Sequence, residues 1–170
     1  LQHADLVARI QLVLDETGLP PDKLEIEITE SIAMRSSGRA VDNLRALKAR
    51  GLRVSIDDLG TGYSSLSALR LFPIDSLKID RSFVNGVPHN TDDSAIAAAV
   101  IALAQTLGVN VIAEGIERPE QLAFFTEHRC AEWQGFLLVS PLTGERCEQL
   151  LFGEGPAVAP EPVGATLASR

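Results

Sequence analysis

The chain has 170 residues, 45% of them apolar, and a formal net charge of −8 at pH 7. This length is enough for a single domain with a sizeable core. The excess of acidic residues argues against a nucleic-acid polymer as partner, because binding to phosphates requires clustered Lys and Arg. The longest apolar run, 95–104, is too short to span a bilayer, so we expect this segment to make no membrane contact.

Helices and strands are predicted to alternate along the chain. From the spacing of apolar residues and the signals at segment ends we predict helices over 5–17, 38–50, 64–71, 91–107, 119–128 and 145–152, and strands over 24–29, 76–80, 109–114, 131–134 and 136–139. A further strand begins at Val54. Alternation of this kind predicts an α/β fold with a parallel sheet and helices outside it. The strands are enough for an open sheet, or for most of a barrel whose opening strands are missing.

The two ends of the chain differ in character. The first residue is Leu1 and a helix is predicted almost at once, so we expect a piece of a longer polypeptide. From Gly153 onward Pro, Ala, Gly and Val follow one another without a period, which is typical of a disordered tail or linker. We therefore assign residues 1–152 to one domain and 153–170 to a tail.

The strand that begins at Val54 ends at two adjacent carboxylates, Asp57 and Asp58. Two neighbouring acids repel each other if both are ionised and dry, so either one pKa rises or a cation lies between them. Gly60 and Gly62 follow and give a flexible loop. A strand end with paired acids and a flexible loop is where parallel α/β proteins bind ligands.

Charged residues interrupt four of the predicted strands, although strands in parallel sheets are usually apolar on both faces. They are Glu27, Asp57, Lys78 and Glu114. Because parallel strands end on one rim, we expect these groups to converge there. Three explanations stay open: a Mg²⁺ or Mn²⁺ site, a structural network of ion pairs, or a solvated rim. Oxygen-rich ligation fits these ions better than zinc, since no His or Cys stands at ligand spacing.

Other candidate groups have ordinary structural explanations. We expect Cys130 and Cys147 to be small buried residues in a reducing, cytoplasmic compartment, because they form neither a CxxC pair nor a disulfide framework. Trp133 and Phe136 are expected in the core beside the last strands. The helix over 91–107 is apolar nearly all round, so it should be buried on more than one side, and its second apolar side could form a subunit interface.

Five motifs resemble one known family. They are Leu24-Glu25-Ile26-Glu27-Ile28-Thr29-Glu30-Ser31, Asp57-Asp58-Leu59-Gly60-Thr61-Gly62-Tyr63-Ser64-Ser65, Leu77-Lys78-Ile79-Asp80, Ala113-Glu114-Gly115-Ile116-Glu117 and Gln134-Gly135-Phe136. In order and spacing they are similar to the EAL domain, the bacterial phosphodiesterase domain that linearises cyclic di-GMP. The resemblance covers roughly 1–152. It implies an incomplete TIM-barrel-like fold, a site at the carboxyl rim, and two divalent ions, Mg²⁺ or Mn²⁺.

The resemblance also implies roles for individual residues. Glu27 and Asp57 would be metal ligands, with Asp57 bridging to a second ion that Asp58 helps to hold. Lys78 would orient or activate the attacking water. Glu114 would hold a metal-bound water or the second ion.

Three further residues have supporting roles by the same resemblance. Glu30 would steady the loop after Asp58, while Glu117 and Gln134 would be supporting rim residues. The loop that contains Tyr63 would lie near both the site and a dimer contact. The implied partners are cyclic di-GMP and a second copy of the domain, in a parent protein that other domains could tether to a membrane.

The chain departs from the family pattern in ways that bear on activity. The Glu-Ala-Leu signature and the following strand with its Asn ligand are absent, and both would lie upstream of Leu1. Leu59 stands where Phe is usual, and Ser140 where a basic residue is common. Two alternatives to a phosphodiesterase therefore stay open: a catalytically silent EAL-like receptor or interaction module, and an unrelated barrel hydrolase that uses the same rim.

Overall fold

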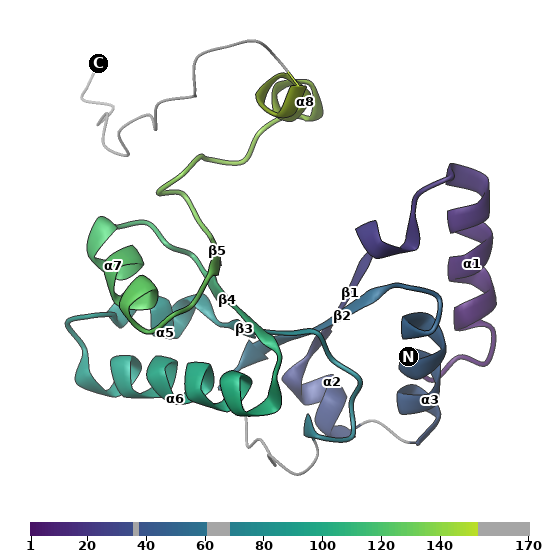
Figure 1. Cartoon of the computed structure of the whole chain (residues 1–170), viewed down its shortest axis with the longest axis horizontal. Helices are drawn as coiled ribbons and strands as arrows, with labels where there is room; N and C mark the ends of the chain where they lie inside the picture. The colour runs from purple at the N-terminus through teal and green to yellow at the C-terminus, as the bar shows by residue number, and fades with distance from the viewer. Residues whose placement is uncertain (36–37, 61–68, 153–170) are drawn as a thin grey trace, which may run out of the picture.

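One parallel sheet organises the fold. The computed structural model describes residues 1–35, 38–60 and 69–152. The strands are β1 (Glu25–Thr29), β2 (Arg53–Leu59), β3 (Ser76–Ile79), β4 (Asn110–Glu114) and β5 (Glu132–Gln134), and they lie side by side in chain order (Figure 1). Each strand pairs in parallel with the next. This uninterrupted order is that of a β/α barrel, because a doubly wound sheet changes direction at a switch point.

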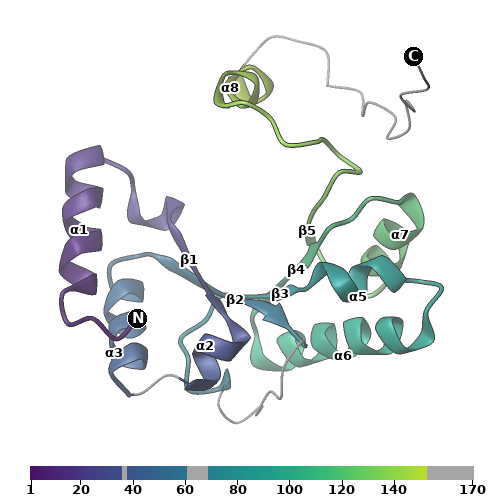
Figure 2. The ribbon, with the colours of Figure 1, turned by 180° about the vertical axis from the view of Figure 1, so that it is seen from behind.

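Helices connect the strands and cover one face of the sheet. They are α1 (Leu6–Thr17), the 3₁₀ turn η1 (Pro21–Lys23), α2 (Glu30–Arg35), α3 (Gly38–Lys48), α5 (Arg81–Gly86), α6 (Thr91–Leu107), α7 (Pro119–Glu127) and α8 (Gly144–Phe152). In both views α2, α3 and α6 lie below the sheet, whereas α8 lies apart from it (Figures 1 and 2). None of the helices in the described ranges is long and apolar enough to cross a membrane.

Local signals explain where the longest helix begins and ends. The Asn90 side chain accepts hydrogen bonds from the backbone N–H groups of Asp92 and Asp93 at the start of α6, which is the usual work of an N-cap residue. Two acids in the first turn also favour the helix dipole. Gly108 ends α6 with a φ of 70°, a left-handed conformation that glycine adopts at low cost.

The pleat gives the sheet one apolar and one polar face. Val54, Ile56, Leu77 and Ile79 are fully buried and pack into the main core. Apart from Ile112, the residues that alternate with them along the strands are polar: Glu25, Glu27, Thr29, Ser55, Asp57, Ser76, Lys78, Asn110, Glu114, Glu132 and Gln134. Since side chains alternate along a strand, the polar groups of all the strands share the face opposite the helices. The polar side chains therefore lie on one face of the sheet, and the hydrophobic core packs against the other.

The structure confirms most of the sequence predictions and corrects four. Cys147 is exposed, whereas Cys130 is buried as expected. The 136–139 segment forms no strand, and Phe136 is 42% exposed rather than part of the core. The six-residue helices α2 and α5 were not predicted. The buried residues of α6, Ala97, Val100, Ile101 and Ala104, lie on one side of the helix, whereas Ile96 is 36% exposed; α6 is therefore buried on one side only. Tyr63, most of the predicted helix over 64–71, and the predicted tail over 153–170 lie outside the described residues.

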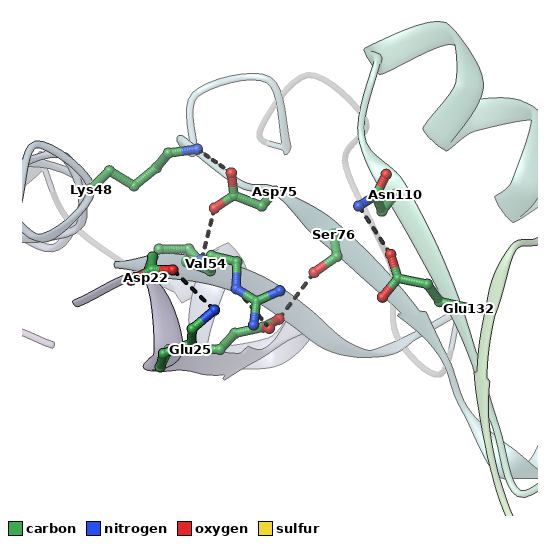
Figure 3. Close-up of polar contacts among 10 residues, drawn as sticks. Asp22, Glu25, Lys48, Val54, Asp75, Ser76, Asn110 and Glu132 are labelled. Atoms are coloured by element: carbon green, nitrogen blue, oxygen red, sulfur yellow. Dashed lines mark hydrogen bonds and ion pairs between the residues drawn. The ribbon is translucent and has the colours of Figure 1, made fainter. Parts of the chain in front are cut away.

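Polar contacts join the amino ends of the strands, on the rim opposite the acids of the motifs (Figure 3). The Asp75 carboxylate accepts the N–H of Val54 over 2.9 Å and lies 2.7 Å from the ammonium of Lys48. Asp75 thus ties the β2–β3 connection to the start of β2 and to α3. Further hydrogen bonds link Ser76 to Glu25 and Asn110 to Glu132. This rim is a structural part of the sheet, as at the amino face of β/α barrels.

We expect Asp75→Asn to lower the free energy of unfolding by about 1 kcal/mol, because a neutral amide with one acceptor oxygen replaces the charged carboxylate shared by Val54 and Lys48. Lys48→Met should cost less, since it leaves the hydrogen bond to Val54 and breaks only a partly exposed pair. Urea denaturation of the two variants measures both values. Equal losses of unfolding free energy in the two variants would contradict a stabilising role of the hydrogen bond between Asp75 and the Val54 N–H.

Candidate active site

Four neighbouring strands bring three carboxylates to one lysine. The Lys78 side chain, on β3, is 6% exposed. Its Nζ lies 2.6 Å from Glu114 Oε1 on β4, 2.9 Å from Glu27 Oε2 on β1 and 3.6 Å from Asp57 Oδ1 on β2. All three carboxylates therefore come within 4 Å of a single atom. The convergence expected from the sequence is present, and within the described structure it takes the form of an ion-pair network.

An irregularity in β2 shapes the end of that strand. Ile56 pairs with Leu77, and the next pair is Leu59 with Ile79, so β2 carries one residue more than β3 across this interval. Asp58 has a φ of 57°, which is uncommon for any residue but glycine. Such bulges re-aim side chains and occur next to active sites. The Asp57 carboxylate accepts the N–H of Asp58 over 2.9 Å, which fixes the orientation of the first acid.

The network decides the charge on Lys78. Burial by itself lowers the pKa of an ammonium group, but the hydrogen bonds to Glu114 and Glu27 outweigh burial and raise the pKa of Lys78 above its ordinary value. Burial raises the pKa of Glu114, against the opposing effect of Lys78. Lys78 is consequently a protonated hydrogen-bond donor at neutral pH. In this arrangement it can orient a water or an anionic oxygen but cannot accept a proton.

Asp80 belongs to this region and was missed by the sequence interpretation. Burial raises the pKa of Asp58, and the neighbouring charges of Asp57 and Asp80 raise it further. Asp80 also caps α5 by accepting the N–H of Ser82 over 2.9 Å; burial opposes ionisation of Asp80, but these hydrogen bonds lower its pKa. The available signal was its position, directly after the strand residues Lys78 and Ile79 and before a helix.

The supporting residues inferred from the family pattern lie in different places. Glu30 is buried, and its Oε2 accepts the N–H of Gly60 over 2.9 Å, so it contacts the first residues of the loop after Asp58. Gln134 donates to Glu114 Oε1 over 2.8 Å and thereby adjoins the network. Glu117 does not join the network. Its carboxylate pairs with Arg81, 2.6 Å away.

The donor chemistry of the rim fits a hard divalent cation. The carboxylates of Glu27, Asp57 and Glu114 lie around the Lys78 ammonium, and that of Asp58 lies close to those of Asp57 and Asp80. This excess of oxygen ligands is of the kind that Mg²⁺, Mn²⁺ and Ca²⁺ prefer. In the structure, however, Glu27, Asp57 and Glu114 form ion pairs with Lys78. Within the described ranges no group of three or more His, Cys, Asp or Glu side chains is arranged to hold an ion. The residues thus fit a metal in chemistry, while their arrangement is that of the ion-pair network.

The parallel strands in chain order, with acids on their carboxyl rim, define a TIM-barrel-like α/β domain of the kind that carries its site at strand ends. The profile of the EAL domain matches residues 1–141. The chain belongs to the EAL domain family, and the predicted fold class is confirmed.

Similar proteins carry names that concern cyclic di-GMP. The cyclic di-GMP phosphodiesterase NbdA of Pseudomonas aeruginosa is 44% identical over 151 residues, which cover 89% of this chain and 19% of NbdA. The solved structure of the PaMucR phosphodiesterase in complex with c-di-GMP has a TM-score of 0.81 and 44% identity, over 85% of this chain and 59% of that one. A manganese/cy-diGMP complex of Klebsiella pneumoniae BlrP1 has a TM-score of 0.75 and 34% identity, over 82% of this chain and 36% of that one. The chain spans about a fifth of the length of the curated relatives it matches.

Replacing the central lysine tests the electrostatic description of the site. We expect Lys78→Met to lower the free energy of unfolding by about 3 kcal/mol, because it leaves partly buried carboxylates facing one another without their cation. Glu27→Gln should cost less, since the Glu27 side chain is 49% exposed. Chemical denaturation in the presence of a chelator measures both. A Lys78→Met variant as stable as the unmodified protein would contradict the network.

Proposed function

We propose that this domain, within the protein of which it is part, hydrolyses cyclic di-GMP to the linear dinucleotide with the help of Mg²⁺ or Mn²⁺. The observation that carries the proposal is the approach of Glu27, Asp57 and Glu114 to one point on the carboxyl rim. Membership in the EAL family and the similarity to NbdA and to the PaMucR complex support it. Membership also removes the third alternative, an unrelated barrel hydrolase.

The carboxylates would divide the work of holding the ions. Glu27 and Asp57 would hold the first, and Asp57 and Asp58, with Glu114, the second. When bound, two divalent ions lower the pKa of a water and screen a phosphodiester from the acids around it. The crowded carboxylates that raise the pKa of Asp58 would gain a compensating charge. The manganese complex of BlrP1 supports a divalent ion of this kind in the family.

Lys78, Glu114 and Gln134 would orient the reacting groups. The Lys78 ammonium can donate to the lone pair of the attacking water or to an oxygen of the scissile phosphate. Lys78 and Gln134 both donate to Glu114 Oε1, so the oriented carboxylate can accept a hydrogen bond from the same water in a fixed direction. Holding the nucleophile in one orientation removes a large entropic part of the barrier.

A second candidate function is a catalytically silent receptor or interaction module for cyclic di-GMP. One observation favours it: in the described residues the acids contact Lys78 and are not arranged around an ion. A domain of this kind would bind the dinucleotide without cleaving it. Turnover decides between the two functions.

We also propose a homodimer in the complete domain and a cytoplasmic location. The exposed side of α6 supports the dimer, because Ile96, Ala99 and Leu103 line an apolar groove of about 260 Å³ together with Leu59. Apolar surface of this kind commonly marks a contact with another protein.

We expect Asp57→Asn and Glu27→Gln to lower kcat at least about 100-fold. Each replaces a charged carboxylate, proposed as a metal ligand, with a neutral amide and so weakens the electrostatic stabilisation of the transition state. The fold should persist, because the polar face lies opposite the core. The assay is conversion of cyclic di-GMP to the linear dinucleotide by the natural full-length protein, with circular dichroism as the control. Near-normal turnover by the Asp57→Asn variant would defeat the proposal.

Removal of divalent ions should abolish turnover, and addition of Mg²⁺ or Mn²⁺ should restore it, because the ions supply the activated water. Titration calorimetry with cyclic di-GMP, with and without metal, gives the accompanying binding constants. Binding that yields no linear product under any metal condition would favour the silent receptor. Turnover that persists in excess chelator would contradict both functions.

A further inference from the structure

Gln121, at the start of α7, is a fully buried polar residue whose amide group joins two separate segments. Its Oε1 accepts the N–H of Glu117 over 2.8 Å and the N–H of Arg118 over 2.9 Å. Its Nε2 donates to the carbonyl of Val84, in α5, over 2.9 Å. The side chain therefore connects the β4–α7 segment to α5. Without it, the partly buried N–H groups of Glu117 and Arg118 would lose this acceptor, which is costly.

The neighbouring residue strengthens the same connection. Arg118 Nη2 donates to the carbonyl of Asn85 over 2.8 Å and to that of Val87 over 3.2 Å. These carbonyls lie at the end of α5, where a helix leaves backbone acceptors without internal partners. A helix of only six residues has little stability of its own. The position of α5 therefore depends on the side chains of Gln121 and Arg118, which donate hydrogen bonds to its carbonyl groups and to that of Val87.

The first residue of α5 is Arg81, which lines an open cavity of about 530 Å³ together with Glu117 and Gln134. Among the described residues that line this cavity, Arg81 alone is cationic. Its stem passes over Gly115, where a Cβ atom would come within 2.5 Å of Arg81 Cγ and where φ is 77°. Glycine is required at this position by both the approach and the backbone angle.

The ion pair of Arg81 with Glu117 does not by itself fix the guanidinium. Its N–O distance is 2.6 Å, but the Arg81 side chain is 54% exposed, and exposed pairs contribute little to stability. The geometry of the pair must come from the backbones that carry it. Gln121 contacts both of them, through Glu117 N–H on one side and Val84 in α5 on the other.

We infer that Gln121 is a positioning residue: by holding α5 against the β4–α7 segment, it keeps the Arg81 guanidinium at the cavity, where Arg81 binds an acceptor oxygen of a guanine nucleotide. This inference rests on the proposed function for the identity of the ligand. Guanidinium groups present planar pairs of donors that suit phosphate oxygens and the O6/N7 edge of guanine. Arg81 is also the cation that an anionic ligand would meet in this cavity, apart from the buried Lys78 of the neighbouring network.

The test compares Gln121→Met, Arg81→Ala and the double variant in the natural full-length protein. Gln121→Met keeps the length of the side chain and removes its hydrogen bonds. It should raise KM for cyclic di-GMP about tenfold and change kcat about twofold or less, because a binding contact is displaced while the acids on the rim stay in place. The double variant should have a KM close to that of Arg81→Ala, because Gln121 acts through Arg81. Amide exchange at Glu117 and Arg118 should accelerate in Gln121→Met.

Asp75→Asn is the matched control, since it also alters a side chain that accepts a backbone N–H, at the opposite rim. It should lower the melting temperature and leave KM unchanged. A Gln121→Met variant that melts earlier with unchanged KM, or whose effect adds fully to that of Arg81→Ala, would overturn the inference. If Gln121→Met does not fold, Arg118→Met should raise KM in the same direction by a smaller factor, and an unchanged KM would overturn the inference.

The two levels of the proposal fail in different ways. An unmodified protein that neither binds nor hydrolyses cyclic di-GMP contradicts the proposed function. In that case amide exchange at Glu117 and Arg118 still decides whether Gln121 holds this segment in place. Unchanged exchange in Gln121→Met would overturn the positioning role independently of any activity.

Discussion

The fold of this domain is organised around one electrostatic constraint: the carboxylates of Glu27, Asp57 and Glu114, on three strands, need a positive charge between them. Lys78 supplies it, from the strand at the middle of the sheet. A group of like charges that is shielded from water would otherwise oppose folding. The constraint also explains why the lysine stays protonated, and hence why its contribution to any reaction is to donate hydrogen bonds. The same crowding makes the rim receptive to a divalent ion.

The division of the sheet into two faces follows from the same requirement. Buried aliphatic residues such as Val54 and Leu77 hold the helices on one side, so the polar side is free to carry groups chosen for chemistry. At the opposite rim Asp75 and its partners join the strand starts without contributing to the site. Packing, strand connection and chemistry thus occupy separate parts of a small sheet. Changes in one part can be tested with little effect on the others.

Much of this arrangement could be predicted from the sequence, and the exceptions have physical reasons. The strict alternation around Ile26 and Ile28 and the capped, glycine-ended stretch after Asn90 predicted β1 and α6 correctly. Helices α2 and α5 are too short to show a helical period, and they depend on tertiary contacts such as those of Gln121. Phe136 was placed in the core on its apolar character and on a predicted strand over 136–139; this segment forms no strand, and Phe136 is 42% exposed. Family resemblance named the site acids, but only the strand register brings them to one point.

The extra residue in β2 allows two aspartates to follow one another at the end of this strand. If side chains alternated strictly after Ile56 and Asp57, Asp58 would point into the hydrophobic core and Leu59 would lie on the polar face of the sheet. Because the strand accommodates one surplus position, Leu59 returns to the interior opposite Ile79 and is 2% exposed. Two successive aspartates can then stand at one margin without either being buried among aliphatic groups. A chain whose second strand ran without interruption would have to give up one of the two.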